Sequence, residues 1–259
     1  MKFFDTHAHC DDKRFESEYE GGTFGVINDC LSSNVSYIIN IGTDLNNSKA
    51  SIELAEKFEN VYASCGIHPS EVFYDDPDRA VAEIEKLLAH PKAVALGEIG
   101  LDYHYEDIPK DLQMIYFEKQ MKLAEKLKIP VIIHDRDAHG DCLEMIKKFP
   151  TVKGVFHSFS GSPEMASELT KMGWYISFSG TVTFKNAKKP KEAASIVDSE
   201  KLLIETDAPY LAPTPHRGTL NRSSYVELTA QEIANLRGVS LSEIERITTE
   251  NAKRLFGIK

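Results

Sequence analysis

The chain has 259 residues, of which 42% are hydrophobic and 27% charged, so it can bury a sizeable core like an ordinary soluble globular protein. Its formal net charge of −10 argues against a protein that coats nucleic acid, but not against a site that holds phosphate through local basic loops. The four cysteines form no CxxC pair, and no apolar run reaches signal-peptide or membrane-span length. We therefore expect a reduced, cytoplasmic protein with no membrane partner.

Short apolar runs alternate with segments of helical periodicity. The apolar runs predict eight strands, at 2–7, 37–42, 61–66, 93–99, 130–134, 153–158, 174–179 and 201–206. Helical patterns lie between them, for example at 46–58, 78–89, 110–128 and 163–172. Apolar runs without period-two alternation are typical of parallel strands buried on both faces. Eight of them favour a (β/α)8 TIM barrel over an open doubly wound sheet.

The C-terminal part, 222–256, predicts two additional helices, the second capped by Ser240 with Glu243 three residues later. The sequence shows no linker, low-complexity tract or internal repeat. We therefore predict one domain that spans residues 1–259.

Potential metal ligands end several of the predicted strands. His7 and His9 are two residues apart on the first strand, so both rings point to the same side. Glu98 ends the fourth strand, and His134 and His157 end the fifth and sixth. A buried carboxylate is unfavourable unless it is paired or bound to a metal. Because active sites lie at the carboxyl ends of barrel strands, these residues predict a centre with two cations.

Asp207 ends the eighth strand, which neighbours the first when the barrel closes. It is therefore predicted to join His7 and His9 on one metal and to act as general base toward a water molecule. Glu205, two residues earlier, should also face inward, where either support of a ligand or proton handling is possible. His68 ends the third strand. Its side chain could either contact the substrate or support a metal ligand, and the sequence favours neither role.

Basic residues follow several of these strands. Arg136 comes shortly after His134, and its planar guanidinium suits phosphate. Lys185 opens a lysine cluster after the seventh strand, which is either a solvated helix start or an anion contact. His216 and Arg217 lie beyond the eighth strand, on the side expected to contact substrate. We predict that these four residues bind substrate.

These motifs together closely resemble the TatD family of metal-dependent deoxyribonucleases, within the amidohydrolase-type barrels. The segments DTHAH, GIHP, GEIGLDY, IHDRDA, FHSFSG, ISFSGTVTFKNAK, LLIETDAPYLAP and PHRG occur in the family's order and cover nearly the whole chain. The resemblance implies two divalent ions, one bound by His7, His9, Glu98 and Asp207 and the other by Glu98, His134 and His157. It also implies hydrolysis of DNA phosphodiesters, commonly as a 3′–5′ exonuclease that depends on magnesium.

Two segments depart from the family pattern. Ser70 stands where the family often has a second histidine after GxHP, and the run after PHRG is Thr219-Leu220-Asn221-Arg222-Ser223 instead of Lys-x-Asn-Glu-Pro. Both segments border the expected site, so they bear on substrate preference. The metal ligands are untouched.

We therefore expect a metal-dependent deoxyribonuclease that acts on DNA, with single-stranded ends as the expected partner and a monomer as the default state. Magnesium is the first choice of cation, whereas the four imidazoles favour manganese or zinc. The alternative enzyme is an amide, lactone or aminoacyl-ester hydrolase that uses the same metals. A non-catalytic binding module is a further alternative, but such a protein could lose a ligand and none is missing here.

Overall fold

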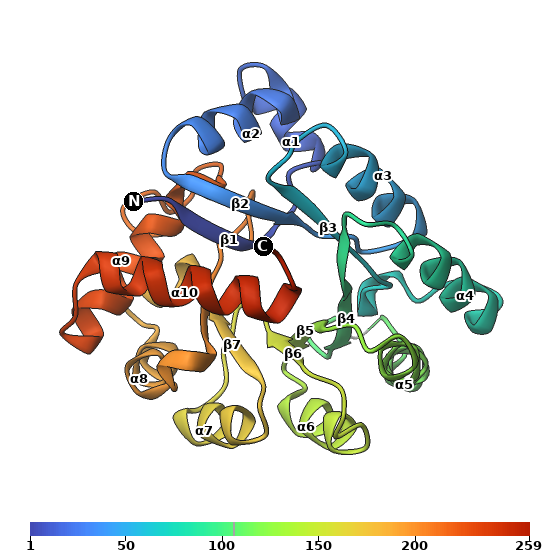
Figure 1. The fold of residues 1–259 in the computed structure, drawn as a ribbon. Coiled ribbons are helices and arrows are strands. Elements are labelled where there is room, and N and C mark those ends of the chain that lie inside the picture. The colour runs from blue at the N-terminus through green and yellow to red at the C-terminus, as the bar shows by residue number, and fades with distance from the viewer. Residues whose placement is uncertain (106) are drawn as a thin grey trace. The chain divides into compact units, whose positions relative to one another are not determined.

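The computed structural model describes residues 1–105 and 107–259. Eight strands form one sheet in the order of the chain (Figure 1). They are β1 (Phe3–Ala8), β2 (Val35–Asn40), β3 (Val61–Cys65), β4 (Ala93–Asp102), β5 (Val131–Arg136), β6 (Gly154–Phe156), β7 (Tyr175–Phe178) and β8 (Leu202–Ile204). A parallel bridge between Ala8 and Ala208 connects the segment after β8 back to β1. The predicted (β/α)8 barrel is confirmed, and each predicted strand overlaps an observed one.

Helices follow the strands, as the fold class requires. They are α1 (Lys13–Glu18), α2 (Gly22–Ser32), α3 (Leu45–Ala55), α4 (Pro77–Leu88), α5 (Lys110–Leu127), α6 (His139–Lys147), α7 (Pro163–Lys171), α8 (Lys188–Ile196), α9 (Val226–Arg237) and α10 (Leu241–Phe256). Four short 3₁₀ helices are η1 (Pro69–Glu71), η2 (Gly180–Thr183), η3 (Ser199–Lys201) and η4 (Ser223–Tyr225). The two predicted C-terminal helices are confirmed as α9 and α10.

The chain divides into two compact units. One consists of Met1–Asn40 and His157–Lys259 and carries β1, β2, β7 and β8. The other consists of Ile41–Phe156 and carries β3 to β6. The single domain over residues 1–259 stays a prediction.

Buried strands and capped helices account for the local structure. Phe3, Ile38 and Leu203 are fully buried in the first unit, and each such side chain contributes roughly 2 kcal/mol of hydrophobic stabilisation. The Ser240 side chain accepts a hydrogen bond from the Glu243 backbone N–H at the start of α10, so the predicted cap is confirmed. Among the residues described, no helix combines the length and apolar composition needed to cross a bilayer.

A glycine allows β4 and β5 to approach each other closely. Gly100 of β4 pairs with His134 of β5 and has a φ of 138°. A Cβ atom at this position would lie 2.0 Å from the carbonyl oxygen of His134. Glycine is therefore required for the strand pairing that carries Glu98 and Asp102 of β4 beside His134.

We expect Gly100→Ala to lower the free energy of unfolding by about 2–4 kcal/mol, because the new methyl group collides with backbone and φ is positive. Urea unfolding followed by circular dichroism measures this change. Gly140→Ala is the matched control, since nothing lies within 4 Å of its added Cβ. The control should be neutral or stabilising by up to about 1 kcal/mol. Equal unfolding midpoints for the two variants would contradict the role assigned to Gly100.

Candidate active site

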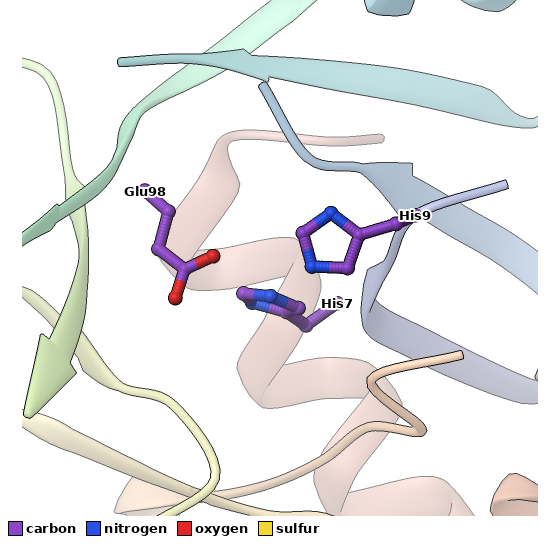
Figure 2. Close-up of side chains that lie close together, drawn as sticks. All are labelled: His7, His9 and Glu98. Atoms are coloured by element: carbon purple, nitrogen blue, oxygen red, sulfur yellow. The ribbon is translucent and has the colours of Figure 1, made fainter. Parts of the chain in front are cut away.

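In the first unit, the junction between β8 and β1 gathers three potential ligands. The Asp207 backbone N–H donates to the His7 carbonyl at 2.9 Å, and the His9 N–H donates to the Ala208 carbonyl at 2.7 Å. Figure 2 shows the imidazoles of His7 and His9 beside each other, and their ring centroids are 5.1 Å apart. β1 ends at Ala8, so His9 lies one residue beyond the strand, and the two rings still lie on one side, as the spacing predicts.

Asp207 faces both of these imidazoles. Its Oδ1 atom lies 3.5 Å from Nε2 of His7 and 3.4 Å from Nε2 of His9. Burial alone would raise the pKa of Asp207, but the hydrogen bond from His9 and the neighbouring histidine charges hold it below the usual value. The residue also has a φ of 57°, a left-handed conformation that is uncommon for a side chain other than glycine. Asp207 is therefore an ionised carboxylate held in an unusual backbone position.

His157 and Glu205 extend the same cluster. The His157 ring stacks on the His7 ring at 4.0 Å with an interplanar angle of 8°. Glu205 Oε1 accepts a hydrogen bond from the Ser158 N–H at 2.8 Å and lies 3.2 Å from Nδ1 of His157. Its Oε2 is buried and has no hydrogen-bond partner among the described residues. Such an oxygen is unfavourable unless a cation or a proton satisfies it.

The second unit carries a comparable cluster around Glu98, which Figure 2 also labels. Oε1 of Glu98 lies 2.7 Å from Nδ1 of His134, and Oδ2 of Asp102 lies 3.0 Å from the other ring nitrogen. His68 approaches Glu98 through Nε2 at 3.6 Å. Burial would raise the pKa of Asp102, but its interactions with His134 lower it, so this carboxylate is ionised as well.

Both clusters fit a divalent cation. Ligand atoms of His7, His157 and Glu205 lie within 4.8 Å of one another, and so do those of His68, Glu98 and His134. Imidazole and carboxylate donors together suit zinc, manganese and related ions. Imidazoles that bind metals usually keep the second ring nitrogen on a carboxylate, which Asp102 provides for His134 and Glu205 for His157.

The prediction that His68 ends the third strand is wrong. β3 ends at Cys65, and His68 is instead the N-cap of η1, which begins at Pro69. The backbone N–H of Ser70 donates to Nδ1 of His68 at 3.0 Å, and the Ser70 hydroxyl lies 2.7 Å from the same nitrogen. Ser70, the residue that departs from the family pattern, therefore orients His68 so that Nε2 faces Glu98.

Of the predicted substrate-binding residues, Arg136 ends its strand, whereas Lys185, His216 and Arg217 lie in the segments that follow β7 and β8. Arg136 is the exposed last residue of β5, with its guanidinium carbon 5.4 Å from the Tyr105 ring centroid. Arg217 is exposed and lies 4.0 Å above the Phe184 ring. His216 stacks on Tyr225 at 4.3 Å. These three ring contacts do not use the N–H donors of the two guanidinium groups or of the imidazole.

The lysine cluster has two kinds of members. Lys185 is exposed in the turn between η2 and α8, and Lys188 and Lys189 are exposed at the start of α8. Lys191 forms an ion pair with Glu232 of α9 at 2.7 Å. Lys191 therefore joins two helices, whereas the other three lysines face solvent, where an anion can reach them.

Two carboxylates of the site were missed from the sequence. Asp5 Oδ1 accepts hydrogen bonds from the N–H groups of Thr206 (2.9 Å) and His7 (3.3 Å), and Oδ2 accepts from the Thr206 hydroxyl at 2.6 Å. Asp102 orients His134 as described above. Both residues carry the signal that identified Glu98, a carboxylate inside an apolar run, and this signal was available in FFDTHAH and GEIGLDY.

Comparison with known proteins identifies the family of the chain. The model of the family described as TatD related DNase matches residues 4–257. The chain is 44% identical over 257 residues to the uncharacterized metal-dependent hydrolase YabD of Bacillus subtilis, with 98% of this chain and 99% of the relative covered. It is 38% identical over 260 residues to YcfH of Escherichia coli, also named as an uncharacterized metal-dependent hydrolase, with 100% and 97% covered.

A solved structure is similar over the same length. YJJV, a TatD homologue from Escherichia coli K12, superposes with a TM-score of 0.90 at 29% identity and covers 99% of this chain and 98% of its own. The relatives are named as metal-dependent hydrolases, and the clusters of imidazoles and carboxylates in this barrel suit that class of enzyme. The chain belongs to the TatD family, as its resemblance predicted.

The environment of Asp5 predicts a pH dependence of stability. Burial raises its pKa to about 7 in the folded metal-free protein, against hydrogen bonds that lower it, whereas the unfolded chain keeps the ordinary value of 3.8. Between pH 4 and 7 the folded state thus binds one more proton than the unfolded state, so stability falls as pH rises, by on the order of 4 kcal/mol. Asp5→Asn should remove this decline in EDTA-treated protein, as urea midpoints across pH 4–8 would measure. An unchanged pH profile would contradict the assignment.

Proposed function

We propose that the protein hydrolyses phosphodiester bonds in DNA and acts as a 3′–5′ exonuclease. The observation that carries the proposal is the pairing of imidazoles with ionised or buried carboxylates at the ends of strands in both units. Exposed cations at the end of β5 and in the segments after β7 and β8, namely Arg136, Lys185 and Arg217, support an anionic substrate over a neutral amide or lactone. Membership in the TatD family supports the same reaction.

We further propose that two divalent ions complete the site. His7, His9, Glu98 and Asp207 would hold one ion, and Glu98, His134 and His157 would hold the other. When bound, such ions supply Lewis-acid charge that acidifies water and stabilises the negative charge of the transition state. Magnesium is the first choice from the family, and manganese or zinc suits the imidazole donors better.

In this mechanism Asp207 accepts the proton of the attacking water. It suits this role because neighbouring histidines keep it ionised and its backbone is held by the hydrogen bond to His7. Glu205 holds the ring of His157 through Nδ1, and its second oxygen can take part in proton transfer. His68, oriented by Ser70, would donate a hydrogen bond to the developing charge on the substrate.

The substrate is held by charge at the rim of the site. Arg136, Lys185 and Arg217 would neutralise phosphates of the DNA strand, and His216 would contact the substrate beside Arg217. We propose single-stranded ends as the substrate and a monomer as the active form. The four cysteines are buried free thiols, which suits the reducing cytoplasm that we propose as the location.

End-labelled DNA tests this function directly. We expect the protein to shorten single-stranded DNA progressively from the 3′ end with magnesium or manganese, and EDTA to abolish the reaction. Asp207→Asn should lower turnover at least about a thousandfold with an unchanged circular dichroism spectrum, because the amide cannot accept the proton.

Asp75→Asn is the matched control, since Asp75 is an exposed carboxylate ahead of α4. It should cleave DNA like the original protein. The nuclease assignment would be wrong if no cation supported cleavage of any DNA, and the role of Asp207 would be wrong if Asp207→Asn remained active.

The number of ions is a separate prediction. Titration calorimetry with Mn²⁺ should give about two equivalents, His9→Ala and His134→Ala should each lose about one, and Glu98→Gln should weaken both, because each residue supplies ligands to a stated ion. His90→Ala serves as the control, since His90 pairs with Glu56 at 3.2 Å beyond the end of α4. A single equivalent in the unmodified protein would exclude the two-ion centre.

A further inference from the structure

Tyr210 is an exposed aromatic residue next to the first cluster. It comes three residues after Asp207, and its backbone N–H donates to the Asp207 carbonyl at 2.8 Å. Its side chain points back toward the ligands, because its ring centroid lies 5.9 Å from that of His9 with an interplanar angle of 80°. The residue is nevertheless 47% exposed. Single exposed aromatic residues are common on protein surfaces, so the feature that matters here is the position of this ring beside His9 and Asp207.

The ring is held in place from two sides. Its hydroxyl donates to Oδ2 of Asp12 at 2.8 Å, and the guanidinium carbon of Arg14 lies 4.2 Å from the ring centroid. Arg14 is fixed in turn by Asp12, with 3.1 Å between Nε and Oδ1. Asp12, Arg14 and Tyr210 thus form a rigid group, which we call the Tyr210 platform.

The Tyr210 ring has a cation over one face and is about half exposed. Arg14 lies over that face, so a base would approach the ring from the opposite face, and the 47% exposure of the residue leaves room for it. An aromatic face accepts any nucleobase by stacking, and a cation on the other side strengthens the ring's interactions with polar groups. A base is separated from its own phosphate by one sugar, a span comparable to the 5.9 Å between the rings of Tyr210 and His9.

We propose that Tyr210 stacks on the nucleobase of the nucleotide whose phosphate is bound at the first cluster. This inference rests on the proposed function and names a recognition residue for it. Stacking is indifferent to base identity, so the platform would make the enzyme sensitive to the presence of a base and insensitive to its sequence. The base would also be positioned before cleavage at no cost in ordering the ring, because Asp12 and Arg14 already hold it.

The test compares two single-stranded oligonucleotides that differ only at the nucleotide to be removed. One carries a natural base, and the other carries an abasic tetrahydrofuran residue. The unmodified protein should cleave the base-bearing strand with a kcat/KM about five- to a hundredfold higher. Tyr210→Leu should lose this preference by slowing only on the base-bearing strand, and Tyr210→Phe should keep most of it.

Tyr62→Leu is the matched control. Tyr62 lies near the start of β3 and also carries a cation over its ring, with Lys92 Nζ at 4.8 Å. This variant should retain the preference for the base-bearing strand. If Tyr210→Leu slows both strands equally, the ring is only structural and the proposal is overturned. The proposal is also overturned if Tyr210→Leu cleaves both strands like the unmodified protein.

A binding measurement separates this inference from the proposed function. Calorimetry with dAMP and with deoxyribose 5-phosphate needs no turnover. The unmodified protein should prefer dAMP, and Tyr210→Leu should bind the two compounds equally. If no DNA is cleaved but this pattern holds, the nuclease assignment fails and the stacking platform stands. If DNA is cleaved but neither measurement distinguishes Tyr210→Leu, the platform fails and the nuclease assignment stands.

Discussion

The site of this protein depends on the parallel alignment of β1 with the segment that follows β8. Backbone hydrogen bonds join His7 to Asp207 and His9 to Ala208, although about two hundred residues separate these partners in the chain. Buried Asp5 reinforces the junction through the backbone and hydroxyl of Thr206. A one-residue slip of register would turn His7 and Asp207 to opposite faces. The ligand geometry is thus a consequence of strand pairing.

Buried carboxylates are the second constraint, and their surroundings divide them into two kinds. Asp207 and Asp102 face histidines, which lower their pKa values below the ordinary range despite burial. Asp5 faces only neutral donors, and burial raises its pKa to about 7. The same side-chain chemistry therefore gives two anions suited to cations or protons and one group that is sensitive to pH near neutrality. Neighbouring charge, more than burial, decides which role each carboxylate can take.

Several residues that border the clusters are arranged in ways that bear on the proposed recognition of substrate. Ser70 orients His68 through its backbone N–H and its hydroxyl, and the hydroxyl stands where relatives often place an imidazole. Arg136 and Arg217 lie over aromatic rings, which restrict their side chains while leaving the guanidinium edges open to phosphate. The Tyr210 platform uses the same combination of cation and ring, with a carboxylate added to hold both. The residues proposed for recognition thus combine arginine with aromatic rings.

The sequence by itself determined the eight strands, the fold class and the family, because uninterrupted apolar runs and ligand-type residues at their ends are local properties of the chain. It also identified Glu98, His134 and Asp207 as candidate ligands, because they are polar residues at the ends of apolar runs. Only the tertiary structure decided that Asp102 orients His134, that Asp5 ties Thr206 to β1, and that His68 caps a 3₁₀ helix beyond β3. These roles depend on hydrogen bonds between segments distant in the chain or on where a strand stops. Residue type and spacing do not encode such contacts, so they become visible only when the strands are paired.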